Sequence, residues 1–329
     1  MRTITLEEHF ATPEFFAGPA RFVKERAEKM GGGRYAAVME RLCDLGAKRL
    51  SEMDAAGIEI SVLSLNAPLI QAIPNVSQAI ETARRGNDFL AEEVAKNPSR
   101  FLAFAALPMQ DPDAASEELT RCVRQLGFKG AKVNGFSQKD REDSAVYYDM
   151  PEYRPFWRVV ESLGVPFYLH PREPLPSQQL SYVGHPWLMG PSWAFGVETA
   201  THALRLMASG LLDEYPKLTL MLGHLGETLP TAVWRIDHWF RLAPRGLPAK
   251  RKMSEYLRDN FYITTAGNFC SHTLTDTITE VGVDRILFAA DYPFERMTEA
   301  AEWFDNLDVI SEEDRLKIGR TNAEKLLKL

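Results

Sequence analysis

The segment Leu6–Phe10 places a carboxylate and an imidazole two residues apart, at Glu7 and His9. It closes a strand-like stretch that begins at Thr3. Side chains alternate between the two faces of a strand, so we expect Glu7 and His9 to share one face and Glu8 to take the other. A carboxylate oxygen and an imidazole nitrogen on one face can bind the same divalent metal ion. Because such a triplet is common by chance, a metal site needs further ligands.

Three more polar residues each follow an apolar, strand-like run, namely His170, His224 and Asp291. A single histidine in such a place is more often structural, but a carboxylate there is costly unless a cation or hydrogen bonds satisfy it. Polar groups at the ends of four strands are hard to explain by packing, and together they predict one mononuclear metal site. Nitrogen and oxygen donors suit Zn²⁺, Mn²⁺ or Fe²⁺, and the spacing alone does not choose among these ions.

Short β-rich runs alternate with longer helical patterns along the chain, which predicts a single-domain (β/α)₈ barrel over residues 1–329, with an open doubly wound sheet as the alternative. The expected strands are Thr3–His9, Glu59–Leu65, Phe101–Leu107, Gly130–Asn134, Pro166–His170, Leu218–Gly223, Phe261–Thr265 and Arg285–Ala290. The expected helices are Ala47–Ala56, Val76–Ala95, Asp113–Leu126, Glu152–Leu163, Val197–Asp213, Thr228–Phe240 and Leu274–Val281. Two extra helical stretches follow in the C-terminal tail, Thr298–Phe304 and Ser311–Lys328.

Two insertions follow the first and fifth expected strands, at residues 11–46 and 171–196. Both leave the carboxyl ends of strands, where barrel active sites are built. The second insertion is rich in proline and carries Trp187, Trp193 and Phe195. Rigid aromatic loops in this place suggest a lid and walls for a flat apolar substrate. A loop that only packs over the barrel mouth is the alternative for any one of these aromatic residues.

Several other reactive residue types have simpler interpretations. We expect Lys132 to be a salt-bridged lysine inside the barrel rather than a carbamate that bridges two metal ions. We expect His202 and His238 to be packing or surface groups, and Cys270 to be a small buried hydrophobic residue. The cysteines are odd in number and widely separated, which fits a reducing compartment without a disulfide framework, at Cys43, Cys122 and Cys270.

The overall composition excludes some classes of partner. The net charge is −7 and no stripe of lysine and arginine runs along the chain, which argues against nucleic acid. No apolar run approaches the roughly 20 residues of a membrane span, and the N-terminus carries no cleavable leader. We therefore expect a cytoplasmic protein.

The motifs, in their order, resemble the amidohydrolase superfamily and in particular its branch of metal-dependent decarboxylases. The resemblance covers nearly the whole chain and rests on Leu6-Glu7-Glu8-His9-Phe10, Asn66-Ala67-Pro68, Leu169-His170-Pro171-Arg172, Gly223-His224-Leu225-Gly226-Glu227 and Asp291-Tyr292-Pro293-Phe294-Glu295. The chain departs from the pattern at Lys132, where an apolar residue is expected, and at Ala289-Ala290, which replace the more usual Ser-Thr.

The resemblance implies a set of roles. One divalent ion per subunit, Mn²⁺ in preference to Zn²⁺, would be bound by Glu7, His9, His170 and Asp291. His224 and Glu227 would form an acid/base pair beside it. Substrate contacts would come from Asn66, Phe195, Phe294 and Arg235, the last from its own or a neighbouring subunit. The implied assembly is a homotetramer built from dimers.

The implied reaction is the reversible, non-oxidative decarboxylation of an ortho-hydroxybenzoate, with 2,6-dihydroxybenzoate as the favoured substrate. Asp291 is the expected proton donor to the ring, held in place by His224 and Glu227. Two alternatives stay open at this point. One is a metal-dependent hydrolase of a lactone or amide, and the other is a barrel without catalytic activity.

Overall fold

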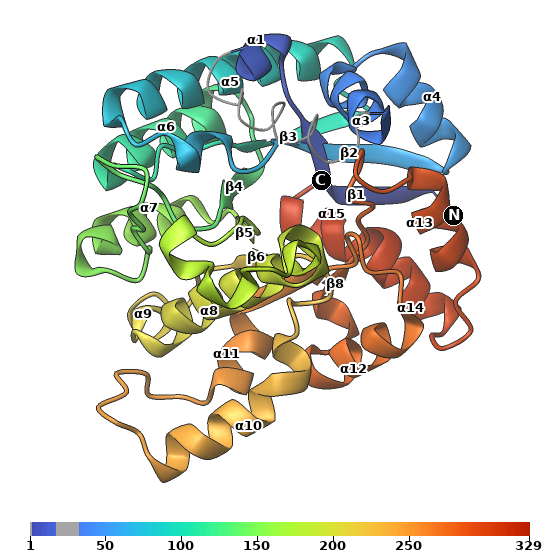
Figure 1. Ribbon diagram of the computed structural model, residues 1–329. Helices are drawn as coiled ribbons and strands as arrows, with labels where there is room; N and C mark the ends of the chain where they lie inside the picture. Colours follow the sequence, from blue (N-terminus) through green and yellow to red (C-terminus); the bar gives the residue numbers. More distant parts are fainter. Residues whose placement is uncertain (1, 18–32) are drawn as a thin grey trace.

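The structure is a computed structural model that describes residues 2–17 and 33–329 (Figure 1). The middle of the first expected insertion, residues 18–32, lies outside the described residues. Among the helices that are described, none is long and apolar enough to cross a membrane.

Eight parallel strands form one sheet in the order of the sequence, β1 to β8, with each strand hydrogen-bonded to the next. Helices surround this sheet, which curls into a nearly closed barrel (Figure 1). All eight expected strands are confirmed, and they are β1 Thr3–Phe10, β2 Ile58–Leu65, β3 Phe101–Ala105, β4 Gly130–Asn134, β5 Phe167–His170, β6 Leu220–Leu222, β7 Phe261–Thr264 and β8 Ile286–Leu287. The last strand is shorter than expected because the amide of Phe288 donates to Ile318 O, outside the sheet.

The helices follow the expected alternation with a few differences. They are α1 Pro13–Ala17, α3 Gly33–Cys43, α4 Ala47–Ala55, α5 Val76–Lys96, α6 Pro112–Gln125, α7 Arg154–Leu163, α8 Ala194–Ala208, α9 Leu211–Glu214, α10 Leu229–Leu242, α11 Met253–Asn260, α12 Ser271–Val281, α13 Met297–Asp305, α14 Glu312–Leu316 and α15 Asn322–Leu327.

One helix that was expected to be continuous is interrupted, and three helices were not expected. The helix expected over residues 197–213 is split into α8 and α9, because Gly210 takes a left-handed backbone with φ 79° that an α-helix does not contain. Helices α1, α3 and α11 were not expected. In the second insertion, short 3₁₀ turns join the prolines, for example Pro186–Leu188.

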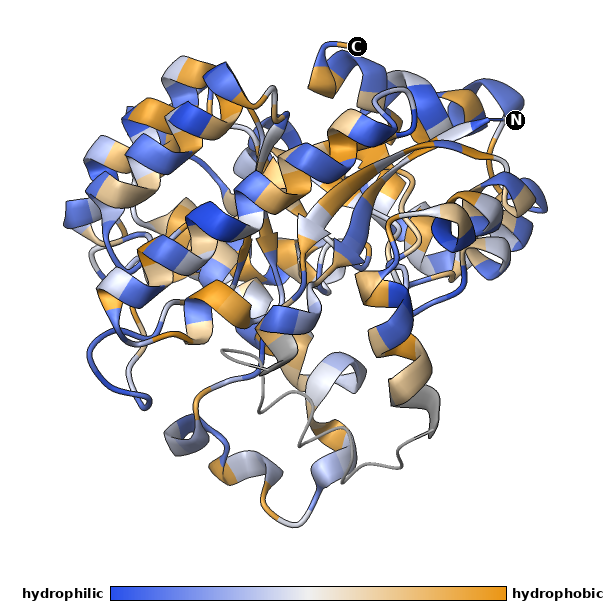
Figure 2. Ribbon diagram, turned by 90° about the horizontal axis from the view of Figure 1, so that it is seen from above, coloured by the Kyte–Doolittle hydropathy of each residue, from blue (hydrophilic) through white to orange (hydrophobic). Residues whose placement is uncertain are grey.

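The barrel interior is filled by buried apolar and aromatic side chains from every strand except β4, and α15 packs against them. These side chains are Ile4, Leu6, Val62, Phe104, Tyr168, Met221, Tyr262 and Leu287, with Ala323 and Leu327 from α15. A larger core lies between the strands and the outer helices. Figure 2 shows this arrangement as hydrophobic strands in the middle and helices of mixed character around them.

A β-bulge in β1 determines which way its polar residues point. Ile4 and Leu6 face the barrel interior, so strict alternation would turn Glu7 outward. The register against β2 shifts, however, between Thr5 and Glu8, where β1 holds one extra residue. The extra residue turns Glu7 and His9 inward and leaves Glu8 on the outer face. The alternation expected within the triplet is therefore present, but only the bulge directs it into the barrel.

Candidate metal centre at the barrel mouth

Glu7, His9, His170 and Asp291 converge at the carboxyl end of the barrel. One possible ligand atom from each lies within 4.8 Å of all the others. His9 Nε2 is 2.9 Å from Asp291 Oδ1, and His170 Nε2 is 3.2 Å from Glu7 Oε1. Three of the four residues are buried, and the side chain of Asp291 is 14% exposed. The ends of β1 and β5 and the segment after β8 supply them.

The Glu7 carboxylate is held by one of its oxygens and leaves the other without a donor. Tyr168 and Thr264 both donate hydrogen bonds to Oε2, whereas Oε1 is buried and accepts none. Gly223 makes room for this carboxylate, because a Cβ there would lie 2.8 Å from Oε2. Sequence reasoning missed Tyr168, although it lies two residues before His170 and so shares its face of β5.

His170 has the protonation pattern of a metal-binding histidine. Its Nδ1 lies 2.9 Å from Pro171 O and donates to it, which leaves the lone pair of Nε2 directed into the cluster. Metal-binding histidines commonly use one ring nitrogen in this way to fix the orientation of the other.

Lys132 contacts His9 rather than a carboxylate, so the expected salt bridge was wrong. Its Nζ lies 2.8 Å from His9 Nδ1, and Lys132 takes part in no ion pair among the described residues. A metal ion on His9 Nε2 requires the proton on Nδ1 and a lone pair on Nζ. Burial lowers the pKa of Lys132 to about 7, so the uncharged amine is accessible near neutral pH.

His224 and Glu227 form a hydrogen-bonded pair beside the cluster. His224 Nδ1 is 2.6 Å from Glu227 Oε1, while Nε2 lies 3.7 Å from Glu7 Oε1 and 3.8 Å from Asp291 Oδ2. Asn268 fixes the turn by donating to His224 O at 3.3 Å. The imidazole therefore links Glu227 to both carboxylates of the cluster.

Burial and neighbouring charges shift the pKa values of these groups in different directions. Burial lowers the pKa of His9 and of His170 well below the ordinary value, and Lys132 adds to both shifts. Burial alone would lower the pKa of His224, but the carboxylates of Glu227 and Glu7 outweigh it and raise the pKa well above the ordinary value. The cluster thus combines neutral imidazoles, which can bind a metal ion, with one imidazole that holds a proton.

The residues fit a divalent ion. Two carboxylates that are buried this close together repel each other, and a cation offsets the repulsion. The unpartnered Oε1 of Glu7 and the free Nε2 of His170 point into the same small volume. Two nitrogen and two oxygen donors match Zn²⁺, Mn²⁺ or Fe²⁺.

A model of the amidohydrolase family matches residues 11–329. The chain belongs to the amidohydrolase family. It is 59% identical over 329 residues to a γ-resorcylate decarboxylase of Rhizobium sp. strain MTP-10005, covering 99% of this chain and 98% of that protein. The matched range begins after Glu7 and His9, but the alignment with this relative covers nearly the whole of both chains.

Solved structures give the same picture. A 2,6-dihydroxybenzoate decarboxylase in complex with 2,6-dihydroxybenzoate is 58% identical, with a TM-score of 0.94 over the whole of both chains. A dihydroxybenzoic acid decarboxylase of Polaromonas sp. JS666, with bound manganese and the inhibitor 2-nitroresorcinol, is 56% identical. Its TM-score is 0.93, and the match covers 100% of this chain and 97% of that one.

Of the expected substrate contacts in this amidohydrolase, three lie at the barrel mouth. The Phe294 ring meets the His9 ring edge-on at 5.4 Å. Asn66 is buried directly after β2, and its backbone N–H donates to Phe10 O. Phe195 is the second residue of α8 and precedes Gly196, where a Cβ would lie 3.3 Å from Glu227 Oε2.

The fourth expected contact lies elsewhere in the amidohydrolase chain. Arg235 is exposed on α10, which extends away from the barrel (Figure 1). A single chain therefore does not bring Arg235 to the cluster.

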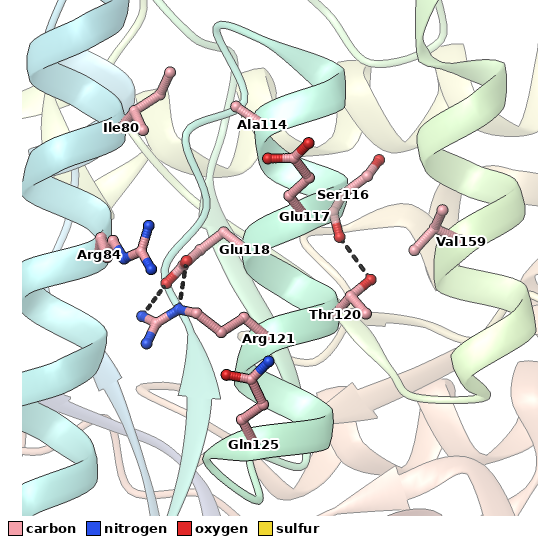
Figure 3. Close-up of a pocket in the computed structure, with 10 residues that line it drawn as sticks. All are labelled: Ile80, Arg84, Ala114, Ser116, Glu117, Glu118, Thr120, Arg121, Gln125 and Val159. Carbon is pink, nitrogen blue, oxygen red and sulfur yellow. Dashed lines mark hydrogen bonds and ion pairs between the residues drawn. The ribbon is translucent and has the colours of Figure 1, made fainter.

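A groove on the outer helices is separate from this centre. It lies between α5, α6 and α7 (Figure 3), and its carboxylate Glu118 is paired with Arg121 through two hydrogen bonds of 2.7 and 2.9 Å. Cys270 was expected to be buried, but it is exposed at the start of α12, because the chain has already left the core after β7. His202 is a buried packing residue of α8, as expected.

Proposed function

We propose that this amidohydrolase is a metal-dependent decarboxylase that converts 2,6-dihydroxybenzoate to resorcinol and CO₂. The observation that carries the proposal is the convergence of four ligand groups within 4.8 Å of one another, next to the His224–Glu227 pair. Relatives that are 56–59% identical over nearly their whole length are decarboxylases of this substrate. The aromatic side chains of Phe294, against His9, and of Phe195, next to Gly196 beside Glu227, would suit a flat aromatic acid.

Glu7, His9, His170 and Asp291 would hold the metal ion. When bound, it supplies Lewis-acid chemistry that withdraws negative charge from the oxygen atoms of the substrate and fixes the ring. The manganese of the Polaromonas relative supports Mn²⁺ as the ion, and Zn²⁺ is the alternative to be compared.

Asp291, His224 and Glu227 would transfer one proton to the substrate ring. Direct loss of CO₂ would leave an electron pair in an sp² orbital of the ring, which is a poor carbanion. We infer instead that Asp291 first donates a proton to the ring carbon that bears the carboxylate, which interrupts aromaticity. The bond to the carboxylate carbon then breaks, its electron pair returns to the ring, and CO₂ leaves. His224, held by Glu227, can return a proton to Asp291, because its Nε2 lies 3.8 Å from Asp291 Oδ2.

The remaining substrate contacts complete the proposal. Asn66, Phe195 and Phe294 would form the walls around the ring. Arg235 would act on a neighbouring subunit, because it lies on the exposed face of α10 between large aromatic residues, with Trp234 72% and Trp239 51% exposed. We propose that this face lies between subunits of a homotetramer, which light scattering would test. The cytoplasmic location stays a prediction for cell fractionation.

The test is an ultraviolet assay with 2,6-dihydroxybenzoate, using Mn²⁺-loaded protein beside EDTA-treated protein and Zn²⁺-loaded protein. Metal-dependent formation of resorcinol with release of CO₂ is the expected result. If folded, metal-loaded protein leaves 2,6-dihydroxybenzoate unchanged, the substrate is wrong. The next substrates would then be 2,3-dihydroxybenzoate, salicylate and 5-carboxyvanillate, followed by lactones.

A further inference from the structure

Glu8 lies between two proposed metal ligands in sequence but faces away from them. It is fully buried on the outer face of β1. Its Oε1 accepts a hydrogen bond from the amide of Ala290 at 3.0 Å, and its Oε2 accepts one from the amide of Tyr292 at 3.1 Å. These two amides are the ones on either side of Asp291. The Glu8 side chain therefore holds the backbone around Asp291, the residue proposed both to bind the metal and to donate the proton.

These two hydrogen bonds lie at the place where the barrel closes. Within the described residues the hydrogen-bonded ladder runs from β1 to β8 and does not continue from β8 back to β1. Strand β8 ends at Leu287, four residues before Asp291. The segment that carries Asp291 is attached to β1 by the two bonds to Glu8 and by the amide of His9, which donates to Tyr292 O at 2.8 Å. Glu8 supplies two of these three bonds to the backbone of the segment, and the side chain of Asp291 adds its own contact with His9 Nε2 at 2.9 Å.

The backbone of Asp291 needs such an attachment. Its φ is 68°, in the left-handed region, which is sterically unfavourable for a residue other than glycine. In this conformation the side chain of Asp291 reaches the cluster, with Oδ1 at 2.9 Å from His9 Nε2. A turn with unfavourable backbone angles keeps them only where its surroundings determine them. The two oxygens of Glu8 hold the backbone N–H groups of the residues directly before and after Asp291.

Arg49 supports the arrangement from behind. Its guanidinium is fully buried and donates to His9 O at 2.7 Å and to Arg41 O at 2.9 Å. It also lies 4.8 Å from the centre of the Tyr292 ring. Arg49 therefore ties His9, the neighbour of Glu8 on β1, to α3, and lies beside the ring of Tyr292, whose backbone N–H donates to Glu8.

We propose that Glu8 is a positioning residue that holds Asp291 in place for metal binding. The proposal rests on the proposed function, because it takes Asp291 as a ligand. Glutamine has nearly the same shape as glutamate but only one acceptor oxygen. In Glu8→Gln the side-chain NH₂ would face one backbone N–H, so one of the two hydrogen bonds is lost. Because outer partners of metal ligands typically contribute 10–100-fold to metal affinity, we expect a loss of about this size.

The experiment is calorimetric titration of Mn²⁺ into metal-free protein, together with thermal unfolding of the same metal-free samples. The matched control is Asn260→Leu, which removes two buried hydrogen bonds to Pro216 O and Leu218 O near the start of β6. We expect both variants to lose thermal stability. Only Glu8→Gln should lose Mn²⁺ affinity.

Each outcome decides one question. Wild-type affinity in folded Glu8→Gln, or an equal loss of affinity in Asn260→Leu, would overturn the proposal. If Glu8→Gln does not fold, Glu8→Asp keeps the carboxyl group with both oxygens on a shorter side chain. Weaker Mn²⁺ binding in Glu8→Asp would then support the proposal, and unchanged binding would overturn it. If the wild-type protein binds no Mn²⁺, the proposed function fails rather than the role of Glu8.

Discussion

His224 Nδ1 lies 2.6 Å from Glu227 Oε1, three residues further along a turn in which both residues have a φ of 53°. The left-handed turn brings the carboxylate back to the ring nitrogen that faces away from the cluster. It therefore leaves His224 Nε2 directed at Glu7 and Asp291, at 3.7 and 3.8 Å. The Glu227 carboxylate therefore stabilises a protonated His224 at Nδ1, while Nε2 faces Glu7 and Asp291.

Replacing Glu227 by glutamine should therefore slow catalysis more than it weakens binding. The uncharged amide no longer supports a proton on His224, and a positioned acid or base typically contributes about 10²–10⁴-fold to rate. We expect kcat to fall by about 100-fold or more, with a much smaller change in KM. Steady-state kinetics with 2,6-dihydroxybenzoate would measure both, and an unchanged kcat would contradict the role of the pair.

Replacing Asp291 by asparagine should abolish turnover. The amide cannot donate the proton that the carboxylic acid would give to the ring carbon, and a loss of at least about 100-fold is expected. Because Asp291 is also a proposed ligand, the metal content of each sample has to be measured. Wild-type turnover in the asparagine variant would rule out Asp291 as the proton donor.

Adding one methyl group at Gly223 should disturb the metal centre although no proposed metal ligand is replaced. In Gly223→Ala the new Cβ would lie 2.8 Å from Glu7 Oε2 and 2.9 Å from the Tyr168 hydroxyl, so the carboxylate has to move. We expect Mn²⁺ affinity to fall by about tenfold or more. Gly46→Ala is the matched control, because the nearest neighbour of its new Cβ would be Asp44 Oδ1, at 3.9 Å. Equal affinities in the two variants would show that the Glu7 carboxylate tolerates the displacement.

Removing the metal should lower thermal stability. A ligand that binds only the folded protein stabilises it by about 2.7 kcal/mol at 100 times its dissociation constant. We expect the unfolding temperature of EDTA-treated protein to rise with added Mn²⁺, and to rise less in variants of Glu7. An unfolding temperature that does not depend on Mn²⁺ would argue against the site.

His202 should make the free energy of unfolding decrease as the pH is lowered. Burial lowers its pKa from 6.5 to about 3, with Arg205 adding to the shift. The unfolded chain therefore takes up a proton below about pH 6.5 while the folded protein does not, so stability is lost as the pH falls from 6.5 towards 3. At pH 4.5 this amounts to about 2–3 kcal/mol.

Denaturant titrations at pH 7.5 and 4.5 would measure the effect of His202. In His202→Asn the difference between the two pH values should shrink, because the titrating group is gone. The exposed His272 offers the control, since His272→Asn should leave that difference unchanged. A wild-type pH dependence in His202→Asn would contradict the assignment.

The sequence by itself determined the eight strands and the ligand types. Apolar runs that end in Glu7, His9, His170 or Asp291 are local patterns, and the carboxyl ends of parallel strands meet at one end of a barrel whatever the loops do. Tyr168 could have been predicted in the same way from its alternation with His170. By contrast, no local pattern marks the contact between Lys132 and His9, which are far apart in the chain.

Only the tertiary structure decided how these groups are oriented. The bulge in β1 turns Glu7 inward, and its signal lies in the pairing with β2 rather than in either strand alone. The left-handed backbone of Asp291 is held by Glu8 across the seam between β1 and β8. Both features depend on hydrogen bonds between segments more than 50 residues apart: the bulge exists only once β1 has paired with β2, and the bonds of Glu8 exist only once the barrel has closed.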